Sequence, residues 1–380
     1  MSMTYKQFQQ FVNADALINR IPLNSTFSLT PRCNLHCKMC LICNPTEVVG
    51  DEMSGDWWLD LARQARDEGM AFCMITGGEP ILHRDFWQIY EGVRKLGVHM
   101  ILNSNGTTIT PEVADRLAKM RPMLMQISVY GSSPEAYKRV TGSAAGFEKT
   151  IRGIELLRER GIDVMFRSML MRETADDMEN IAKLILSYGV KFKYGNYIMM
   201  PMWENCNDVR SMRLSGKEIA EYTIKIENTI KEYHDTHEKP NADDISDEMR
   251  EEYEERSKKP VDPAHVELRR RVREIKSKSA FKCSAGTSYF SVRHDGFIRL
   301  CEVAGDPDML FDLKQISFKD GLERLWTAAA SVPTCAECEG CPDLKKCSPC
   351  PPRHFAESGS YLRKADYVCE YVRADVKLIE

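Results

Sequence analysis

Apolar residues recur in two alternating patterns along the first half of the chain. Short apolar runs typical of strands occupy 25–31, 71–76, 98–103, 123–130, 163–171 and 191–200. Stretches with helical spacing lie between them, at 54–68, 85–96, from 111 onwards, and at 146–160 and 174–188. Six strand–helix units in this order predict a parallel sheet covered by helices. Because eight units close a full barrel, we expect an α/β fold with a partial (β/α)6 barrel.

The rest of the chain lacks this rhythm. Residues 201–280 are rich in charge, with an acidic run followed by a basic one, and we interpret them as a solvated helical linker. The last hundred residues carry eight cysteines among glycine, proline and charged residues. A segment so poor in core-forming residues needs metal to hold it together. We therefore expect four regions: an N-terminal helix at 1–24, the barrel at 25–200, the charged linker at 201–280 and a cysteine-rich domain at 281–380.

The net charge and the cysteine content exclude some classes of function and favour others. A formal net charge of −4 gives no overall basic field for nucleic acid or anionic lipid. No apolar run is long enough to span a membrane or to form the core of a signal peptide, so we expect a cytoplasmic protein without nucleic-acid or membrane partners. Fourteen cysteines are many for a reducing compartment, and most of them are clustered. Clustered thiols in such a chain indicate metal ligands rather than disulfides.

The first cluster directly follows the first predicted strand. Cys33, Cys37 and Cys40 are spaced C-x3-C-x2-C, and sites in parallel sheets lie at the carboxyl ends of strands. Structural zinc sites and iron–sulfur cubanes each take four protein ligands when they are fully ligated. Three cysteines leave one position for another molecule, whereas Cys43 or His36 as a fourth ligand makes a structural zinc site the alternative.

This cysteine trio, with the segments that end the next strands, resembles the radical S-adenosylmethionine (SAM) enzymes. The matching segments are TGGEP at 76–80, NSNG at 103–106 and ISVYG at 127–131. In that family the three cysteines hold a [4Fe–4S] cluster whose fourth iron binds SAM. Reductive cleavage of SAM then yields a 5′-deoxyadenosyl radical, which abstracts a hydrogen atom from the substrate.

The resemblance also implies which residues bind the cofactor. Glu79 is expected to meet its amino group, with Gly77 and Gly78 allowing close approach of the backbone. Arg139 is expected to steady its carboxylate, and Arg167 faces the pocket by strand alternation. The implied cofactor-binding set is Gly77, Gly78, Glu79, Asn103, Ser128, Arg139 and Arg167.

The C-terminal cysteines are similar to the SPASM extension, which carries two auxiliary iron–sulfur clusters. The resemblance assigns Cys338, Cys341, Cys347 and Cys369 to the outer cluster and Cys283, Cys301 and Cys350 to the inner cluster. Two residues separate Cys347 from Cys350, where three are usual. The inner cluster lacks an obvious fourth ligand, so either Cys335 fills the gap or one iron stays open. Two zinc ribbons are the alternative interpretation.

Together the two resemblances imply an enzyme that matures a peptide or small protein, through a thioether or carbon–carbon crosslink. They imply three [4Fe–4S] clusters and SAM as cofactors, and an electron donor such as flavodoxin or ferredoxin. Only 24 residues precede the first predicted strand, so we expect leader recognition to use a separate protein or to be unnecessary. The alternatives are formylglycine-type oxidation, peptide epimerisation with Cys206 returning a hydrogen atom, and a non-catalytic iron–sulfur electron carrier.

Overall fold

A nine-stranded sheet organises the computed structural model, which describes residues 5–42, 51–190, 192–201, 208–237 and 263–373. The strand order is β6-β5-β4-β3-β2-β1-β7-β8-β9. Strands β1 to β6 pair in parallel, each with the next along the chain, which confirms the predicted partial barrel. The strands are β1 (Asn24–Ser28), β2 (Phe72–Thr76), β3 (His99–Ser104), β4 (Leu124–Ser128), β5 (Val164–Met169), β6 (Phe192–Gly195), β7 (Tyr289–Val292), β8 (Phe297–Arg299) and β9 (Phe311–Asp312).

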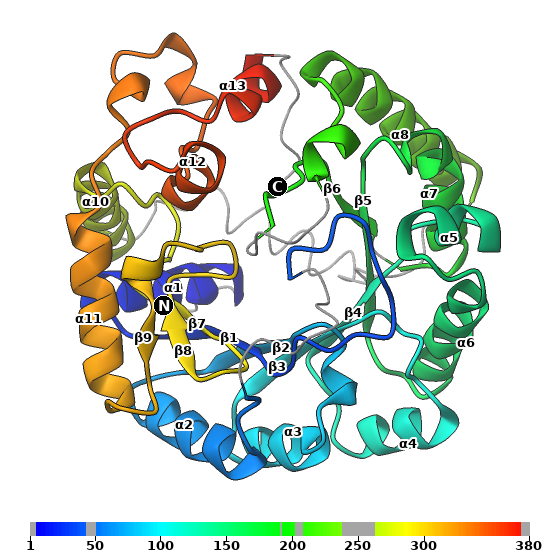
Figure 1. Cartoon of the computed structure of the whole chain (residues 1–380), viewed down its shortest axis with the longest axis horizontal. Coiled ribbons are helices and arrows are strands. Elements are labelled where there is room, and N and C mark those ends of the chain that lie inside the picture. Colours follow the sequence, from blue (N-terminus) through cyan, green and yellow to red (C-terminus); the bar gives the residue numbers. More distant parts are fainter. Residues whose placement is uncertain (1–4, 43–50, 191, 202–207, 238–262, 374–380) are drawn as a thin grey trace.

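Helices form the outer wall around this curved sheet (Figure 1). Those of the barrel region are α1 (Tyr5–Asn19), α2 (Gly55–Asp67), α3 (Phe86–Lys95), α4 (Pro111–Lys119), α5 (Pro134–Thr141), α6 (Ala145–Glu159), α7 (Met178–Ser187) and α8 (Gly216–Thr236). The others are α10 (Pro263–Lys278), α11 (Phe318–Ser331), α12 (Pro351–Ser358) and α13 (Asp366–Arg373). Short 3-10 helices are η1 (Pro80–Leu82), η2 (Ala175–Asp177), η3 (Val209–Met212), η4 (Pro307–Met309), η5 (Ala336–Cys338) and η6 (Pro342–Lys345).

Apolar and polar side chains alternate along the strands, so one face of the sheet is apolar and the other is polar. Phe27, Ile75 and Leu102 lie in register on neighbouring strands and are fully buried. Hydroxyl side chains at Ser54 and Thr110 cap α2 and α4, accepting hydrogen bonds from main-chain N–H groups one turn ahead. The inward face instead carries Asn103 and Gln126, which are register partners on β3 and β4. The barrel therefore has an apolar layer beneath its helices and a polar interior.

The cysteine-rich region extends the barrel sheet itself. Strand β7 pairs in parallel with β1, placing Ser291 opposite Thr26, and β8 and β9 follow as antiparallel strands. The sequence pattern did not predict this continuity, because it joins segments more than 260 residues apart. The pairing brings the chain around Cys301 to the inside of the barrel.

A buried ion pair joins the same region to the other edge of the barrel. The Arg213 guanidinium donates to the Glu357 carboxylate at 3.0 Å, and the Tyr197 hydroxyl donates to it at 2.9 Å. The Arg213 guanidinium also lies 4.4 Å from the centre of the Tyr367 ring. We call this group the Arg213 clamp: Arg213, Glu357, Tyr197 and Tyr367. It fixes α12 and α13 beside the start of α8.

Part of the predicted linker belongs to the barrel wall. Helix α8 packs against α7 and α13, and its buried face includes Ile219 and Ile226. Helix α10 packs against α1. The acidic run at 241–255 lies outside the described residues.

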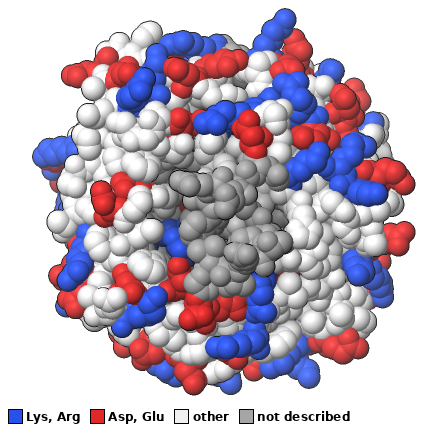
Figure 2. Space-filling model, in the orientation of Figure 1, with Lys and Arg blue, Asp and Glu red and all other residues white. Residues whose placement is uncertain are grey.

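Two surface properties agree with the composition. Acidic and basic side chains are interspersed over the described part of the face drawn in Figure 2, without a field of one sign. Among the described helices, none has both the length and the apolar character needed to cross a membrane.

Candidate functional site

A cavity of about 340 Å³ lies at the carboxyl ends of the barrel strands. Its wall includes the ends of β1 to β4, represented by Ser28, Thr76, Asn103 and Ser128. The segment that follows β1 crosses the inside of the ring (Figure 1). All three cysteines of the first cluster line this cavity, at Cys33, Cys37 and Cys40.

Main-chain hydrogen bonds hold the cysteine loop against α5. The N–H groups of His36 and Lys38 donate to the carbonyls of Thr141 and Val140, both at 3.0 Å. The Asn105 side chain lies 3.6 Å from the Cys33 sulfur and also donates to Asn34 at 2.9 Å. Asn105 belongs to the NSNG segment, although the sequence reasoning singled out Asn103 there. The loop is therefore positioned by the protein itself.

The electrostatics of the trio suit a positively charged occupant. Burial raises the pKa of Cys33 to about 11, and the neighbouring Cys40 thiolate contributes. Burial also raises the pKa of Cys37, with smaller contributions from Cys40 and Cys33. A bound cation would stabilise the Cys33 and Cys37 thiols as thiolates and offset the cost of their burial. The trio therefore fits an iron–sulfur cluster with one iron free for a small ligand.

Gly77 and Gly78 line the cavity, and close contact with the main chain before the cysteines requires glycine at both positions. Gly77 has a φ of 151°, and a Cβ there would lie 2.5 Å from the Thr30 carbonyl oxygen. At Gly78 a Cβ would lie 2.3 Å from the Arg32 carbonyl oxygen. The N–H of Gly78 donates to Thr30 at 2.7 Å, so this loop continues the pairing of β1 and β2 beyond their ends.

Glu79 has partners other than the amino group expected from the sequence. Its carboxylate is fully buried and does not line the cavity. It accepts hydrogen bonds from the Ser104 hydroxyl at 2.9 Å, the Asn105 N–H at 2.8 Å and the Thr108 hydroxyl at 3.2 Å. Burial raises its pKa to about 7, against these hydrogen bonds, which lower it. Glu79 thereby orders the loop that carries Asn105, the neighbour of Cys33.

Three other predicted cofactor residues, Asn103, Ser128 and Arg167, line the same cavity. Ser128 and Arg167 are register partners on β4 and β5. The structure adds Tyr130, which lines the cavity and whose pKa is raised by burial. Arg139 is different, because it lies exposed on α5 and is not part of the cavity wall.

The C-terminal region contributes charged residues to this cavity. Arg299, at the end of β8, and Glu302 both line it. The Tyr289 hydroxyl donates to Glu302 at 2.5 Å and lies 2.6 Å from the Thr26 hydroxyl on β1. Sequence reasoning missed these residues, although they flank Cys301. They place a guanidinium and a carboxylate in the wall of the cavity that the cysteine loop also lines.

The cysteines predicted for the inner cluster lie together. Cys283, Cys301 and Cys350 line a second cavity of about 300 Å³, which Cys347 of the predicted outer set also lines. Burial raises the pKa of Cys301 to about 12, and charges at Glu302, Cys350 and Cys283 raise it further. Their mutual influence is the arrangement expected for ligands of one metal centre.

The cysteines predicted for the outer cluster also influence one another. Burial raises the pKa of Cys347, as do the charges of Cys369 and Cys341. The pKa of Cys338 is raised to about 12, mainly by burial. Its contact with Cys335 and the charges of Cys369 and Cys347 are the smaller causes. Cys335 therefore lies beside the outer set rather than in the inner gap. The turn of η5 is the reason, since the Cys338 N–H donates to the Cys335 carbonyl at 3.1 Å.

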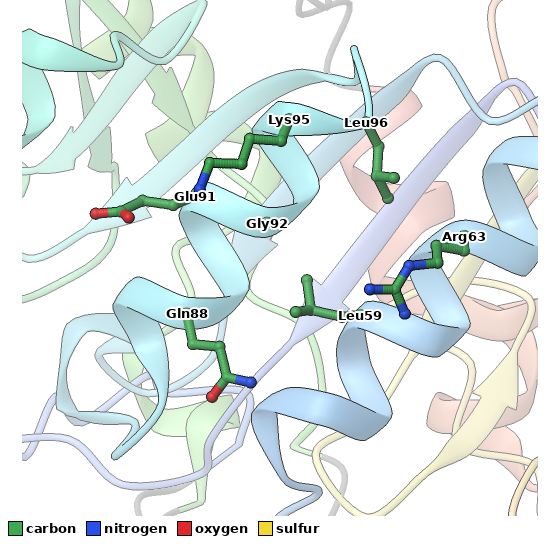
Figure 3. A pocket seen from close by; sticks show the side chains of 7 residues that line it. All are labelled: Leu59, Arg63, Gln88, Glu91, Gly92, Lys95 and Leu96. Atoms are coloured by element: carbon green, nitrogen blue, oxygen red, sulfur yellow. The ribbon is translucent and has the colours of Figure 1, made fainter.

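Two cysteines fall outside the described residues: Cys43 and Cys206. The hydrogen-atom donor suggested at Cys206 therefore stays a prediction. A further cavity of about 460 Å³ lies on the outer wall between α2 and α3; Leu59 and Arg63 of α2 line it together with residues of α3, whose Glu91 and Lys95 side chains extend away from α2 (Figure 3). It contains none of the predicted site residues.

Comparison with known families gives one match, to the radical SAM superfamily over residues 27–185. This span runs from β1 into α7 and includes the cysteine trio and the cavity wall contributed by β1 to β5.

Curated relatives match over the same half of the chain. The AdoMet-dependent heme synthase of Methanosarcina barkeri is 24% identical over 46% of this chain and 50% of its own length. The mycofactocin maturase MftC of Mycolicibacterium smegmatis is 30% identical over 45% of this chain and 44% of its own length. The chain thus spans about half the length of the curated relatives it matches.

Among solved structures, Streptococcus suis SuiB bound to its precursor peptide SuiA has a similar fold. The TM-score is 0.68 at 16% identity, over 97% of this chain and 82% of that one. The shared fold therefore extends beyond the matched family span and includes the cysteine-rich C-terminal region.

Proposed function

Because residues 27–185 form a radical SAM domain, we propose that this chain is a SAM-dependent radical enzyme that modifies a peptide or small protein. The observation that carries the proposal is the common cavity of Cys33, Cys37 and Cys40 with the strand-end residues. When bound there, a [4Fe–4S] cluster and SAM supply a 5′-deoxyadenosyl radical that removes a hydrogen atom from the substrate.

The residues of the cavity have separate tasks in this proposal. Cys33, Cys37 and Cys40 hold the cluster and leave one side of it open to the cavity. Asn103, Ser128 and Arg167 hydrogen-bond with SAM from neighbouring strand ends. Gly77 and Gly78 contribute main chain to the cavity wall.

Glu79 and Arg139 act less directly on the cofactor in this scheme. Glu79 orders the Asn105 loop through its buried hydrogen bonds, so its effect on SAM binding passes through that loop. Arg139 lies on the exposed side of α5, the helix whose last residues hold the cysteine loop. It therefore contributes little to binding of the SAM carboxylate.

The peptide substrate enters opposite the cysteine loop, where Arg299 and Glu302 line the cavity. A charged pair in a half-enclosed cavity orients a polar peptide backbone through hydrogen bonds at a fixed distance from the radical source. The maturase names of MftC and the SuiA complex of SuiB support a peptide substrate. Formation of a thioether or carbon–carbon crosslink is the outcome we propose.

Two auxiliary [4Fe–4S] clusters complete the proposal. Cys283, Cys301 and Cys350 hold the inner one with one open iron, and Cys338, Cys341, Cys347 and Cys369 hold the outer one. The mutual influence of the thiols within each set supports this division. Held by these cysteines, the clusters would supply electron transfer between the substrate and an external donor such as flavodoxin or ferredoxin, and a separate protein would present the leader peptide.

Deuterium transfer tests the substrate class directly. Short peptides encoded beside the gene are synthesised with deuterated residues and incubated with reconstituted enzyme, SAM and dithionite. A substrate peptide transfers one deuterium to 5′-deoxyadenosine and, when a crosslink forms, loses that deuterium and one further hydrogen atom. 5′-Deoxyadenosine without deuterium from any such peptide would contradict peptide modification, while no 5′-deoxyadenosine at all would favour the electron-carrier alternative.

A further inference from the structure

The outer cysteine set contains more donor atoms than a four-cysteine cluster requires. The sulfurs of Cys335 and Cys338 and one ring nitrogen of His354 all lie within 4.8 Å of one another. Cys335 is 9% exposed and His354 is 4% exposed. Within the part of the chain that the structure describes, no other three cysteine, histidine or carboxylate residues bring their donor atoms so close together. We call Cys335, Cys338 and His354 the Cys2His trio.

The size of the Cys2His trio matches one metal ion. Zinc binds cysteine sulfur at about 2.3 Å and histidine nitrogen at about 2.0 Å, so the donors around one tetrahedral ion lie roughly 3.5–4 Å apart. Ligands of a cubane are farther apart, because each sulfur points outward from a different iron. The Cys33, Cys37 and Cys40 sulfurs, proposed to hold a cubane, do not meet the 4.8 Å limit.

Local structure supports the same conclusion. The trio is spaced C-x2-C-x15-H, which is close to the spacing of zinc sites. The turn of η5 presents the two cysteines, and His354 lies on α12, where its N–H donates to the Cys350 carbonyl at 3.1 Å.

We infer that the Cys2His trio binds a single divalent ion of the zinc class and competes with the outer cluster for the Cys338 sulfur. Binding converts the two thiols to thiolates and releases two protons, one of them from Cys335, whose sulfur lies 3.3 Å from the Leu362 carbonyl oxygen. Only the competition rests on the proposed outer cluster. The site itself does not depend on radical chemistry.

Zinc retention tests the site. Metal-free full-length protein is loaded anaerobically with zinc chloride alone and desalted, and the bound zinc is counted. We expect His354→Ala and Cys335→Ser each to retain one zinc fewer than the unchanged protein. The control, His234→Ala, changes a histidine on α8 and should retain the full number. Equal zinc in all four proteins would overturn the site.

Folding and donor identity are checked with cobalt. His354→Gln keeps a polar side chain, and its far-UV circular dichroism should match that of the unchanged protein. Loading with cobalt chloride alone should give tetrahedral absorption bands, and His354→Gln should bind one cobalt ion fewer, with correspondingly weaker bands. Equal cobalt and equal band intensity in a correctly folded His354→Gln would contradict the assignment of His354.

Iron counting tests the competition. Protein loaded with zinc before iron and sulfide are added should hold about four fewer irons than protein reconstituted without zinc. In His354→Ala the same treatment should leave the iron content unchanged. Equal iron with and without zinc in the unchanged protein would refute the competition. A nitrogen coupling on the reduced outer cluster that is lost in His354→Ala would make His354 a cluster ligand and overturn the single-ion site.

Discussion

The barrel and the cysteine-rich segment beyond residue 334 reach stability in different ways. The barrel buries large side chains such as Trp58, Phe27 and Phe166 beneath helices of up to 21 residues. Among the described residues beyond 334 the longest helices, α12 and α13, have eight residues each, and the buried apolar residues are few: Cys335, Pro351, Pro352, Ala365, Val368, Tyr371 and Val372. Helices this short are marginal on their own. We therefore propose that the barrel folds by apolar burial, whereas the cysteine-rich segment depends on bound metal and on the Arg213 clamp.

Breaking the Arg213 clamp, which joins the two regions, should have the largest effect on the free energy of unfolding. Removing one partner of a buried ion pair costs about 3–5 kcal/mol, because the other charge stays buried. We therefore expect Arg213→Met to lower the free energy of unfolding by about that amount in urea titrations. Arg152→Met breaks an exposed pair with Glu155 and should cost less than about 1 kcal/mol. Similar losses in both variants would contradict a clamp.

Removing the metal should affect one region and spare the other. In hydrogen exchange, we expect amides of residues 335–373 to exchange about 100-fold faster in metal-free protein than in reconstituted protein, since that factor equals about 2.7 kcal/mol of lost stabilisation. Amides of β2 to β5 should keep their protection. Faster exchange throughout the barrel would mean that its fold also depends on metal.

A pH series sharpens the comparison inside the barrel. The pKa of Glu79 is about 7 in the folded protein and 4.5 ordinarily, so between these values the folded state holds a proton that the unfolded state has lost. The stabilisation is therefore complete below pH 4.5 and is lost as the pH rises through 7. The difference in unfolding free energy between wild type and Glu79→Gln should change by about 2 kcal/mol from pH 5.5 to pH 8.

The control for Glu79 is the exposed Glu135 on α5. The difference between wild type and Glu135→Gln should be independent of pH over the same range. A flat difference for Glu79→Gln as well would place the Glu79 carboxylate in contact with solvent.

The smallest effect concerns Arg139. Its side chain is exposed and outside the cavity wall, so Arg139→Ala should change the dissociation constant of SAM less than about 2-fold. Arg167→Ala removes a guanidinium that lines the cavity. It should raise the dissociation constant of SAM by about 10-fold or more, as expected for loss of a charge-assisted hydrogen bond. Equal effects at both positions, measured by equilibrium binding, would contradict this placement.

The sequence predicted the barrel well because its pattern is local. Six apolar runs separated by helical segments directly predict parallel strands. The cysteine trio after β1 lines the cavity, as expected. Pairing of β7 with β1 was not predictable in this way, since nothing near either strand encodes a partner so distant in sequence. Arg299 and Glu302 were missed for the same reason.

The sequence also could not predict the direction in which individual side chains point. TGGEP correctly marked the end of β2, but the residue type alone did not tell whether Glu79 faces the cavity or the Asn105 loop. Likewise, the sequence left open whether Cys335 completes the inner set, because its place beside Cys338 and His354 depends on the η5 turn.

The most direct test of the account is formation of 5′-deoxyadenosine. Anaerobically reconstituted protein is mixed with SAM and dithionite, beside Cys37→Ala, which removes one thiol from the cavity. We predict that the unchanged protein forms 5′-deoxyadenosine and that Cys37→Ala loses at least about 1000-fold of this activity, or about 4 kcal/mol of barrier lowering. Its auxiliary cysteines should still bind iron. No 5′-deoxyadenosine from fully reconstituted unchanged protein, or equal amounts from Cys37→Ala, would contradict the proposed function.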